Sequence, residues 1–418
     1  MNGHLQQPHR ASRRGLLTAA GGLLAAAGTK VPDSGAATGR AAGIEAFEGV
    51  HQAGILTPQQ SHCYFAAFDL TADKRDAVVQ LLQAWTDAAG RLTAGQTAAP
   101  MDASLTGPGP DTAEAIGLLP SRLTLTFGFG AGLFVKDGKD RYGLAGLRPE
   151  ALIDLPRFNG DQMVAEKTGG DLSVQACADD PQVAFHAVRQ LARLAYGSAS
   201  LRWTQAGFSS RPPDGTTPRN LLGFKDGTQT PEQPDRAVWV GDDGPAWMHN
   251  GSYLVVRRIR IALEHWDRTK VSFQEQTMGR HKYSGAPLGL KNEFEPLGLD
   301  RNDADENPVI PDNAHVRLGN AAANGAAEIL RRGYSYNDGA NFTAERWPPW
   351  RQGMEYDAGL LFLCYQTDPR TGFVKLFGTM AKFDMLNQFV THTGGGLFAC
   401  PGGIRQGSFL GQRLFTAA

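Results

Sequence analysis

The chain has little cysteine and almost no net charge for its length. Its 418 residues include 41 Lys and Arg against 42 Asp and Glu, so no strong field favours nucleic acid or an anionic membrane as a partner. The four cysteines, Cys63, Cys177, Cys364 and Cys400, form no CxxC pair and show no zinc-ligand spacing. We therefore expect single buried thiols. A disulfide between Cys364 and Cys400 stays open, because its geometry depends on the fold.

Long apolar runs are also absent. The residues SRRGLL (12–17) precede a weakly apolar stretch, 18–28, that is too short to span a hydrocarbon core of about 30 Å. This pattern is typical of a twin-arginine export signal, so we expect no stable membrane anchor. Residues 1–43 are predicted to be a signal peptide and tail that engages the twin-arginine machinery, and the mature protein to be periplasmic or extracellular. That route exports folded proteins, often with a cofactor already inserted.

Hydrophobic periodicity predicts an α+β unit in the first half of the chain. Strands with alternating or continuous apolar residues and helices with apolar residues at helical spacing follow one another in the order strand, helix, strand, strand, helix. The expected elements are strands at 61–70, 123–129 and 172–178 and helices at 76–89 and 181–196. This order suits a ferredoxin-like antiparallel sheet with helices.

The second half repeats the order loosely. The expected elements are strands at 252–261 and 360–366 and helices at 265–275 and 381–390, with a polar extended loop at 282–310. We therefore predict two ferredoxin-like domains of the α+β class, over residues 44–210 and 211–418. The oligomeric state stays open.

Two segments carry residues with catalytic chemistry. In GFKDGT (223–228), glycines on both sides of Asp226 allow the backbone to turn tightly and approach a flat ligand, although Asp-Gly turns are also common without any function. In DNAHVRL (312–318), His315 lies in a loop, where a structural histidine is the simpler interpretation. The segment ILRRGYSY (329–336) follows it and contains an arginine doublet.

Together these segments resemble the dye-decolourising peroxidase family, and the resemblance extends over nearly all of the chain after the leader. FEGVHQAGI (47–55), GGDL (169–172) and LLF (360–362) match further motifs in order, while Thr230 departs from the family's frequent Asn. The leader and the long central loop are similar to the bacterial exported subgroup. The resemblance implies one haem b per chain, bound in the C-terminal half. It also implies a peroxidase that uses hydrogen peroxide to oxidise aromatic reducing substrates and dyes through an oxoferryl intermediate. The alternative is a haem-handling protein that releases iron from haem or delivers haem.

Carried over residue by residue, the resemblance makes His315 the axial iron ligand and Asp226 the distal acid-base group. The distal arginine is Arg331 or Arg332, of which only one should face the cavity because neighbours in an extended segment point opposite ways. Arg331 is favoured because it follows the apolar pair 329–330. The residues expected to line the porphyrin are Gly227, Thr228, Gln229, Asn320, Ala321 and Ala322.

The residue types fit this chemistry. A carboxylate can move a proton between the two peroxide oxygens, and a guanidinium stabilises the developing negative charge. Asp368 and Asp384 are candidates for the carboxylate that bonds the ligand histidine. A free aspartic acid titrates near ~3.9, so we expect an acidic activity optimum.

Other polar and aromatic side chains have simpler interpretations. The aromatic residues Trp266, Tyr334, Tyr336, Trp347 and Trp350 are expected in the core rather than as electron relays. The cluster Arg257, Arg258 and Arg260 is expected to decorate a strand, with pairing to a haem propionate as the alternative.

Overall fold

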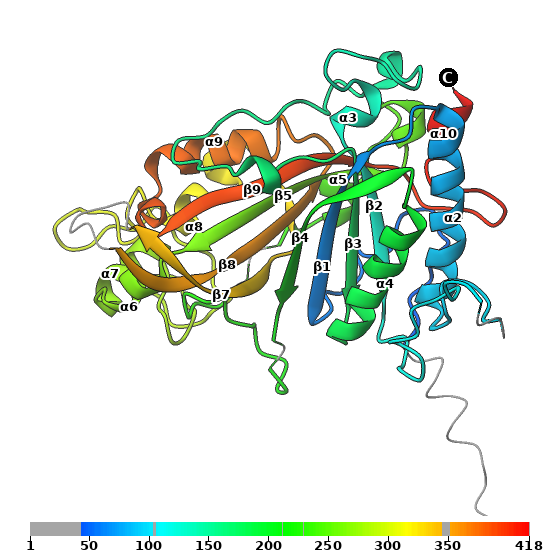
Figure 1. The fold of residues 1–418 in the computed structure, drawn as a ribbon. Coiled ribbons are helices and arrows are strands. Elements are labelled where there is room, and N and C mark those ends of the chain that lie inside the picture. The colour runs from blue at the N-terminus through cyan, green and yellow to red at the C-terminus, as the bar shows by residue number, and fades with distance from the viewer. Residues whose placement is uncertain (1–42, 103–105, 211, 229, 345–351, 418) are drawn as a thin grey trace, which may run out of the picture.

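The computed structural model describes residues 43–102, 106–210, 212–228, 230–344 and 352–417. Within them, nine strands form one sheet (Figure 1). The leader predicted at 1–43 lies almost wholly outside the described residues.

The first half of the chain is a ferredoxin-like unit. Its strands pair in the order β2-β3-β1-β4, and all of these pairings are antiparallel. Helices α2 and α4 cover one face of this half (Figure 1). The elements are β1 (His62–Leu70), α2 (Arg75–Thr93), β2 (Thr124–Phe129), α3 (Ala131–Phe134), β3 (Leu172–Ala178), α4 (Pro181–Leu194) and β4 (Ala199–Phe208).

Helix α4 begins where the sequence supplies a cap. The Asp180 side chain accepts hydrogen bonds from the backbone N–H groups of Gln182 at 2.7 Å and Val183 at 3.1 Å, and Pro181 occupies the first helical position. The apolar face of α4, with Val183, Ala187 and Leu191, is buried against the sheet and α2.

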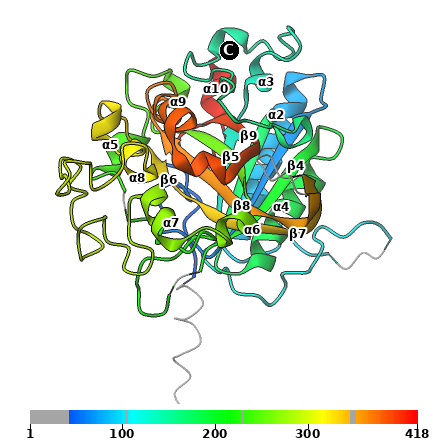
Figure 2. The ribbon, with the colours of Figure 1, turned by 90° about the vertical axis from the view of Figure 1, so that its left-hand side faces the viewer.

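The second half has the same connectivity, with strands in the order β9-β5-β8-β7 and a short strand β6 beside β8. Helix α9 covers β5 and β9 on the side of the molecule away from α2 and α4 (Figures 1 and 2). The elements are α5 (Pro234–Val238), β5 (Ser252–Ile261), α6 (Leu263–Asp267), α7 (Val271–Met278), α8 (His315–Leu318), β6 (Leu330–Arg331), β7 (Tyr334–Ala344), β8 (Gln352–Gln366), α9 (Phe373–Phe383), β9 (Val390–Cys400) and α10 (Gln412–Thr416).

The two halves close into a barrel. Strand β2 meets β9 at the pair Phe129 and Ala399, and β4 meets β7 at the pair Phe208 and Ser335. Because β5 also pairs with β8, the ring of strands has no open edge at either junction. The prediction of two ferredoxin-like units is confirmed, and the closed ring is a feature that element order alone did not predict.

Successive side chains of each strand point to opposite faces of the sheet, so the core has one layer inside the barrel and another outside it. Inward-pointing side chains fill the barrel, among them Phe65, Leu363 and Phe398. The outward-pointing Phe68 and Phe127 pack with Trp85 of α2, so the helices of the first half cover a second apolar layer.

Two predicted helices were wrong in their bounds. The helix expected at 265–275 is two helices, α6 and α7, because the Gln274 side chain donates to the carbonyls of Trp266 and Thr269 and stabilises a break between them. The helix expected at 381–390 is displaced: α9 ends at Phe383, and the Asp384 carboxylate caps a short 3₁₀ turn by accepting from Leu386 N–H at 2.8 Å. Residues 390–400 form strand β9 instead.

Candidate active site

A cavity of about 510 Å³ lies in the C-terminal half, between the outer face of the sheet and the helices α8 and α9. Ile259, Leu360 and Phe362 line it from the strands, and Phe377 and Met380 line it from α9. The volume falls within the usual range for small-molecule sites, and apolar walls with a few polar groups are typical of them. Figure 2 faces this side of the molecule.

Asp226 enters the cavity from the GFKDGT turn. Gly227 has φ +110°, a conformation that only glycine adopts without strain, and Asp226 N–H donates to the Pro218 carbonyl at 2.8 Å. The backbone therefore fixes the position of the carboxylate, which is 30% exposed and lies 3.5 Å from Nη1 of Arg331. Asn220 Nδ2 lies 3.5 Å from its other oxygen.

The arginine doublet is divided between two environments. Arg331 is the register partner of Cys364 on β8 and lines the cavity. Arg332 points the other way, into the barrel, where it is 4% exposed and donates to the Thr57 carbonyl at 2.5 Å. Arg332, the alternative distal arginine, thus lies outside the cavity, because side chains alternate along an extended segment.

His315 is the first residue of α8, and its ring is oriented by a buried carboxylate. Nδ1 lies 2.7 Å from Oδ2 of Asp384, whose side chain is 3% exposed. Of the two candidate partners, Asp368 is instead held by Arg370 at 2.7 Å and does not line the cavity. An imidazole that uses Nδ1 for this bond presents Nε2 as its metal-binding nitrogen.

The central loop supports the GFKDGT turn. Glu293 forms an ion pair with Lys225, the residue before Asp226, and the two side chains are 8% and 16% exposed. Arg219 donates to the carbonyls of Gly223, Lys282 and Tyr283 at 2.6 to 2.8 Å. The loop at 282–310 is therefore part of the scaffold of the site, a role that its polar composition did not indicate.

The remaining predicted residues are distributed as follows. Gly227, Thr228, Asn320 and Ala321 line the cavity, whereas Ala322 does not. Gln229, Trp347 and Trp350 lie outside the described residues. The side chains of Trp266, Tyr334 and Tyr336 are buried in the core.

The three arginines of β5 are engaged within the protein. They pair with acidic side chains and do not line the cavity: Arg257 with Asp161, Arg258 with Asp338 and Asp357, and Arg260 with Glu355. This arrangement agrees with strand decoration rather than with a propionate site.

His392 is a cavity residue that sequence reasoning missed. It lies on β9, is 7% exposed, and its Nδ1 has no hydrogen-bond partner among the described residues. Burial lowers the pKa of His392 to about 3, and the charge of Arg257 contributes in the same direction. The ring is therefore neutral at ordinary pH. Its place in an unpredicted strand hid it from pattern analysis.

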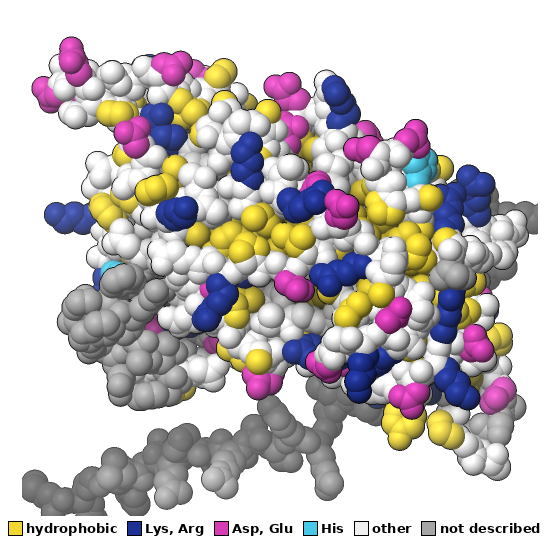
Figure 3. All heavy atoms as spheres, turned by 90° about the horizontal axis from the view of Figure 1, so that it is seen from above, with side chains coloured by type: hydrophobic (Ala, Val, Ile, Leu, Met, Phe, Trp, Pro, Cys, Tyr) yellow, Lys and Arg dark blue, Asp and Glu magenta, His cyan; other side chains and the backbone are white. Residues whose placement is uncertain are grey.

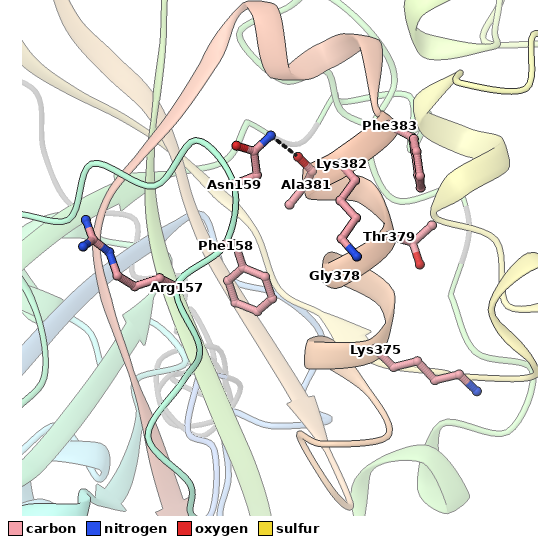
Figure 4. A pocket seen from close by; sticks show the side chains of 9 residues that line it. All are labelled: Arg157, Phe158, Asn159, Lys375, Gly378, Thr379, Ala381, Lys382 and Phe383. Carbon is pink, nitrogen blue, oxygen red and sulfur yellow. Dashed lines mark hydrogen bonds between the residues drawn. The ribbon is translucent and has the colours of Figure 1, made fainter.

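A second hollow of about 380 Å³ lies on the outer side of α9. Figure 4 shows Lys375 and Lys382 extending from α9, with Arg157 on the facing loop. Phe158 lines this hollow and packs against Phe377 of the main cavity with 4.7 Å between ring centroids. The two aromatic rings thus separate the hollow from the cavity.

All four cysteines are described, buried and free, so the disulfide left open between Cys364 and Cys400 is absent. Among the described residues, no helix combines the length and apolar character needed to cross a membrane. On the face seen in Figure 3, acidic and basic side chains are interspersed, in keeping with the near-zero net charge.

Comparison with known protein families agrees with this fold. The Dyp-type peroxidase N-terminal family matches residues 52–209, and the Dyp-type peroxidase C-terminal family matches residues 217–405. The chain therefore belongs to the Dyp-type peroxidase family.

Individual relatives cover most of the chain. It is 39% identical to a dye-decolorizing peroxidase of Thermobifida fusca over 87% of this chain and 83% of the relative. It is 35% identical to a deferrochelatase of Yersinia pestis over 89% of this chain and 85% of the relative. The structure of ferric DtpA from Streptomyces lividans superposes with a TM-score of 0.81 at 41% identity, covering 90% of this chain and 99% of that one.

Proposed function

We propose that this protein is a haem peroxidase of the dye-decolourising type, which uses hydrogen peroxide to oxidise aromatic compounds. The observation that carries the proposal is one apolar cavity containing both the Asp226–Arg331 pair and the His315–Asp384 pair. Family membership and the similarity to a dye-decolorizing peroxidase and to ferric DtpA support the same function.

The residues present fit one haem b. A flat apolar ligand would contact Ile259, Phe362 and Met380, and His315 would bind the iron through Nε2. The hydrogen bond from Nδ1 to Asp384 fixes the tautomer that this requires and increases the donor strength of the ring. When bound, haem supplies the iron centre at which peroxide is reduced.

Asp226 and Arg331 are suited to handle proton and charge. The Asp226 carboxylate would accept a proton from the inner peroxide oxygen and deliver it to the outer oxygen, which then leaves as water. Arg331 stays charged at any working pH, and its guanidinium would stabilise the negative charge that develops on the departing oxygen. Their 3.5 Å separation allows both groups to contact the same small ligand.

Stopped-flow absorbance of the haem-loaded protein tests this function. Mixing with stoichiometric peroxide is expected to change the Soret band rapidly in the wild type, and at least about 100-fold more slowly in Asp226→Ala, the lower end of the usual contribution of a general acid-base group. Equal rates in the two proteins would remove Asp226 from the proton transfer. No spectral change in the wild type would reject the peroxidase function.

Haem handling is the second candidate, because several relatives at 35–36% identity are named deferrochelatases. Incubation of the haem-loaded protein without peroxide separates the two functions. Appearance of free iron together with intact metal-free porphyrin would favour iron release, whereas stable haem that is active with peroxide favours the peroxidase.

Export is also part of the proposal. The motif SRRGLL at 12–17 supports a twin-arginine leader that ends near residue 43. Changing both Arg13 and Arg14 to Lys should retain the protein in the cytoplasm, and N-terminal sequencing of the exported form would locate the cleavage site. Export that is unaffected by this change would reject the assignment.

A further inference from the structure

A polar cluster lies inside the barrel, on the opposite side of β6 and β8 from the cavity. Cys63 on β1 is the register partner of Cys177 on β3, and both are fully buried. Directly opposed residues of antiparallel strands have Cα atoms about 4.5–5.5 Å apart, which falls within the range that a disulfide requires. The sheet thus places the two thiols side by side.

Arg332 brings a positive charge to these thiols. Its guanidinium contacts Cys177, the Thr57 carbonyl and Gln60 Oε1, while its Nε has no hydrogen-bond partner in the part of the chain that the structure describes. Among the described residues, no Asp or Glu forms an ion pair with Arg332. A buried cation without a counter-charge is strongly unfavourable. Of the groups that Arg332 contacts, the Cys177 thiol is the one that can ionise readily, so the charge of Arg332 favours its thiolate form.

Tyr334 completes the surroundings of Cys177. Its hydroxyl donates a hydrogen bond to Sγ of Cys177 at 3.4 Å, and the Cys63 thiol donates to the same sulfur. A sulfur that receives two donors and faces a guanidinium is stabilised as a thiolate.

We propose that Cys177 is a buried thiolate paired with Arg332, and that with Cys63 it forms a dithiol site that hydrogen peroxide oxidises to a disulfide. Nothing in the family assignment gives these residues a role. The inference rests on the proposed function only in that peroxide is a compound this protein meets.

The chemistry balances in two steps. The Cys177 thiolate attacks one peroxide oxygen and the O–O bond breaks; the other oxygen leaves as hydroxide, which takes up a proton from solvent to become water, and Cys177 becomes a sulfenic acid. The Cys63 thiol then loses its proton and attacks the Cys177 sulfur, which releases water and forms the disulfide. Two thiols are oxidised, and one peroxide is reduced to two waters.

The other two cysteines provide a built-in comparison. Burial alone would raise the pKa of Cys177, but the hydrogen bond from Cys63, the charge of Arg332 and the Tyr334 hydroxyl outweigh it and lower that pKa to about 6. Burial raises the pKa of Cys364 to about 12 and that of Cys400 still further. Burial and the hydrogen bond with Cys177 also raise the pKa of Cys63. All four thiols are buried, so the charge of Arg332 and the donated hydrogen bonds, not exposure, distinguish Cys177 from the other three.

Access of peroxide to the cluster would be through the loop that contains Thr57 and Pro58. The Arg332 guanidinium bonds the carbonyl of Thr57, which is half-buried, and the next residue, Pro58, is exposed. Peroxide is a small molecule, so a local opening of this loop would admit it to the cluster.

Peptide mass spectrometry after thiol alkylation tests the proposal. The haem-loaded protein is exposed to hydrogen peroxide, quenched in acid, denatured and alkylated. Cys63 and Cys177 are expected as one disulfide-linked pair, while Cys364 and Cys400 are recovered alkylated. Equal alkylation of all four thiols, before and after peroxide, would overturn the proposal.

Three variants sharpen the test. In Cys63→Ser, a sulfenic acid at Cys177 should be trapped by dimedone, whereas in Cys177→Ser the Cys63 thiol should stay reduced. Cys400→Ser is the matched buried control and should leave the disulfide unchanged. Trapping at Cys63 instead of Cys177 would contradict the assignment of the thiolate.

The Asp226→Ala variant distinguishes a failure of this proposal from a failure of the proposed peroxidase function. Direct attack by peroxide at Cys177 does not use Asp226, so the disulfide should still form when peroxidase turnover is slowed. A disulfide that forms in the wild type but not in Asp226→Ala would overturn the direct reaction.

Discussion

At the cavity, each charged side chain that faces the proposed reaction already has a partner in the protein. Arg331 contacts Asp226, and His315 is bonded to Asp384. Such pairing fixes rotamers before a ligand binds, which reduces the reorganisation needed during a reaction. The two pairs come from different segments of the chain, so each can be tested separately.

Arg331 and Arg332 make a matched pair of substitutions. Arg331→Met should slow the reaction with peroxide by about 10²–10³-fold, the usual cost of removing one charge-stabilising donor, with little change in stability. Arg332→Met should instead lower the free energy of unfolding by about 1–3 kcal/mol, because Thr57 O and Gln60 Oε1 lose their donor. Stopped-flow rates and urea unfolding would distinguish the two variants. A slower peroxide reaction in Arg332→Met and a loss of stability in Arg331→Met would mean that Arg332, not Arg331, faces the cavity.

Asp384→Asn tests the orientation of His315. An amide cannot match the carboxylate as an acceptor for Nδ1–H, so haem affinity should fall about 10–100-fold, as for other partners of metal ligands. The rate of haem transfer to excess apomyoglobin measures this. Asp368→Asn is the control, since Asp368 bonds Arg370 outside the cavity, and similar haem loss from both variants would rule out a specific role for Asp384.

At the scale of elements, the central loop and the GFKDGT turn form one unit through Lys225 and Glu293. Glu293→Gln removes the ion pair and should cost about 1.5–3 kcal/mol locally, as for a hydrogen bond to a charged group. Amide hydrogen exchange should accelerate in 223–228 and 282–310 while the sheet stays protected. Glu295→Gln is the control, because among the described residues its carboxylate accepts hydrogen bonds from Lys291 and Asn292, both within the loop. Unchanged exchange in Glu293→Gln would mean that other contacts, such as those of Arg219 and of Lys282 with Phe224, hold the two segments together.

For the whole molecule, buried His392 makes stability depend on pH. Its pKa is about 3 in the folded protein, whereas an unperturbed histidine titrates near ~6.5. Between these values the unfolded chain binds a proton that the folded protein does not, so stability falls as pH decreases from about 6.5 to about 3. The slope approaches about 1.4 kcal/mol per pH unit.

Unfolding by urea across this pH range measures the effect. His392→Phe should reduce the slope by about 1.4 kcal/mol per pH unit, whereas substitution of the partly exposed His281 should preserve it. A wild-type slope retained in His392→Phe would show that the histidine is not buried in its neutral form.

The sequence by itself determined the local features. Apolar patterns marked strands such as 172–178 and 252–261, and apolar residues at helical spacing marked α4. Ordered motifs indicated the family and singled out Asp226 and His315 as candidates. Short-range patterns reveal these features because strand pleat, helix period and tight turns involve residues near one another in the chain.

Only the tertiary structure decided which distant residues meet. It chose Asp384 over Asp368 for His315 across 69 positions, placed Cys63 beside Cys177 rather than Cys364 beside Cys400, and brought His392 to the cavity. It also closed two sheets into one barrel through two single residue pairs. Strand register and helix packing fix such contacts through the whole core, and no local pattern of residues encodes them.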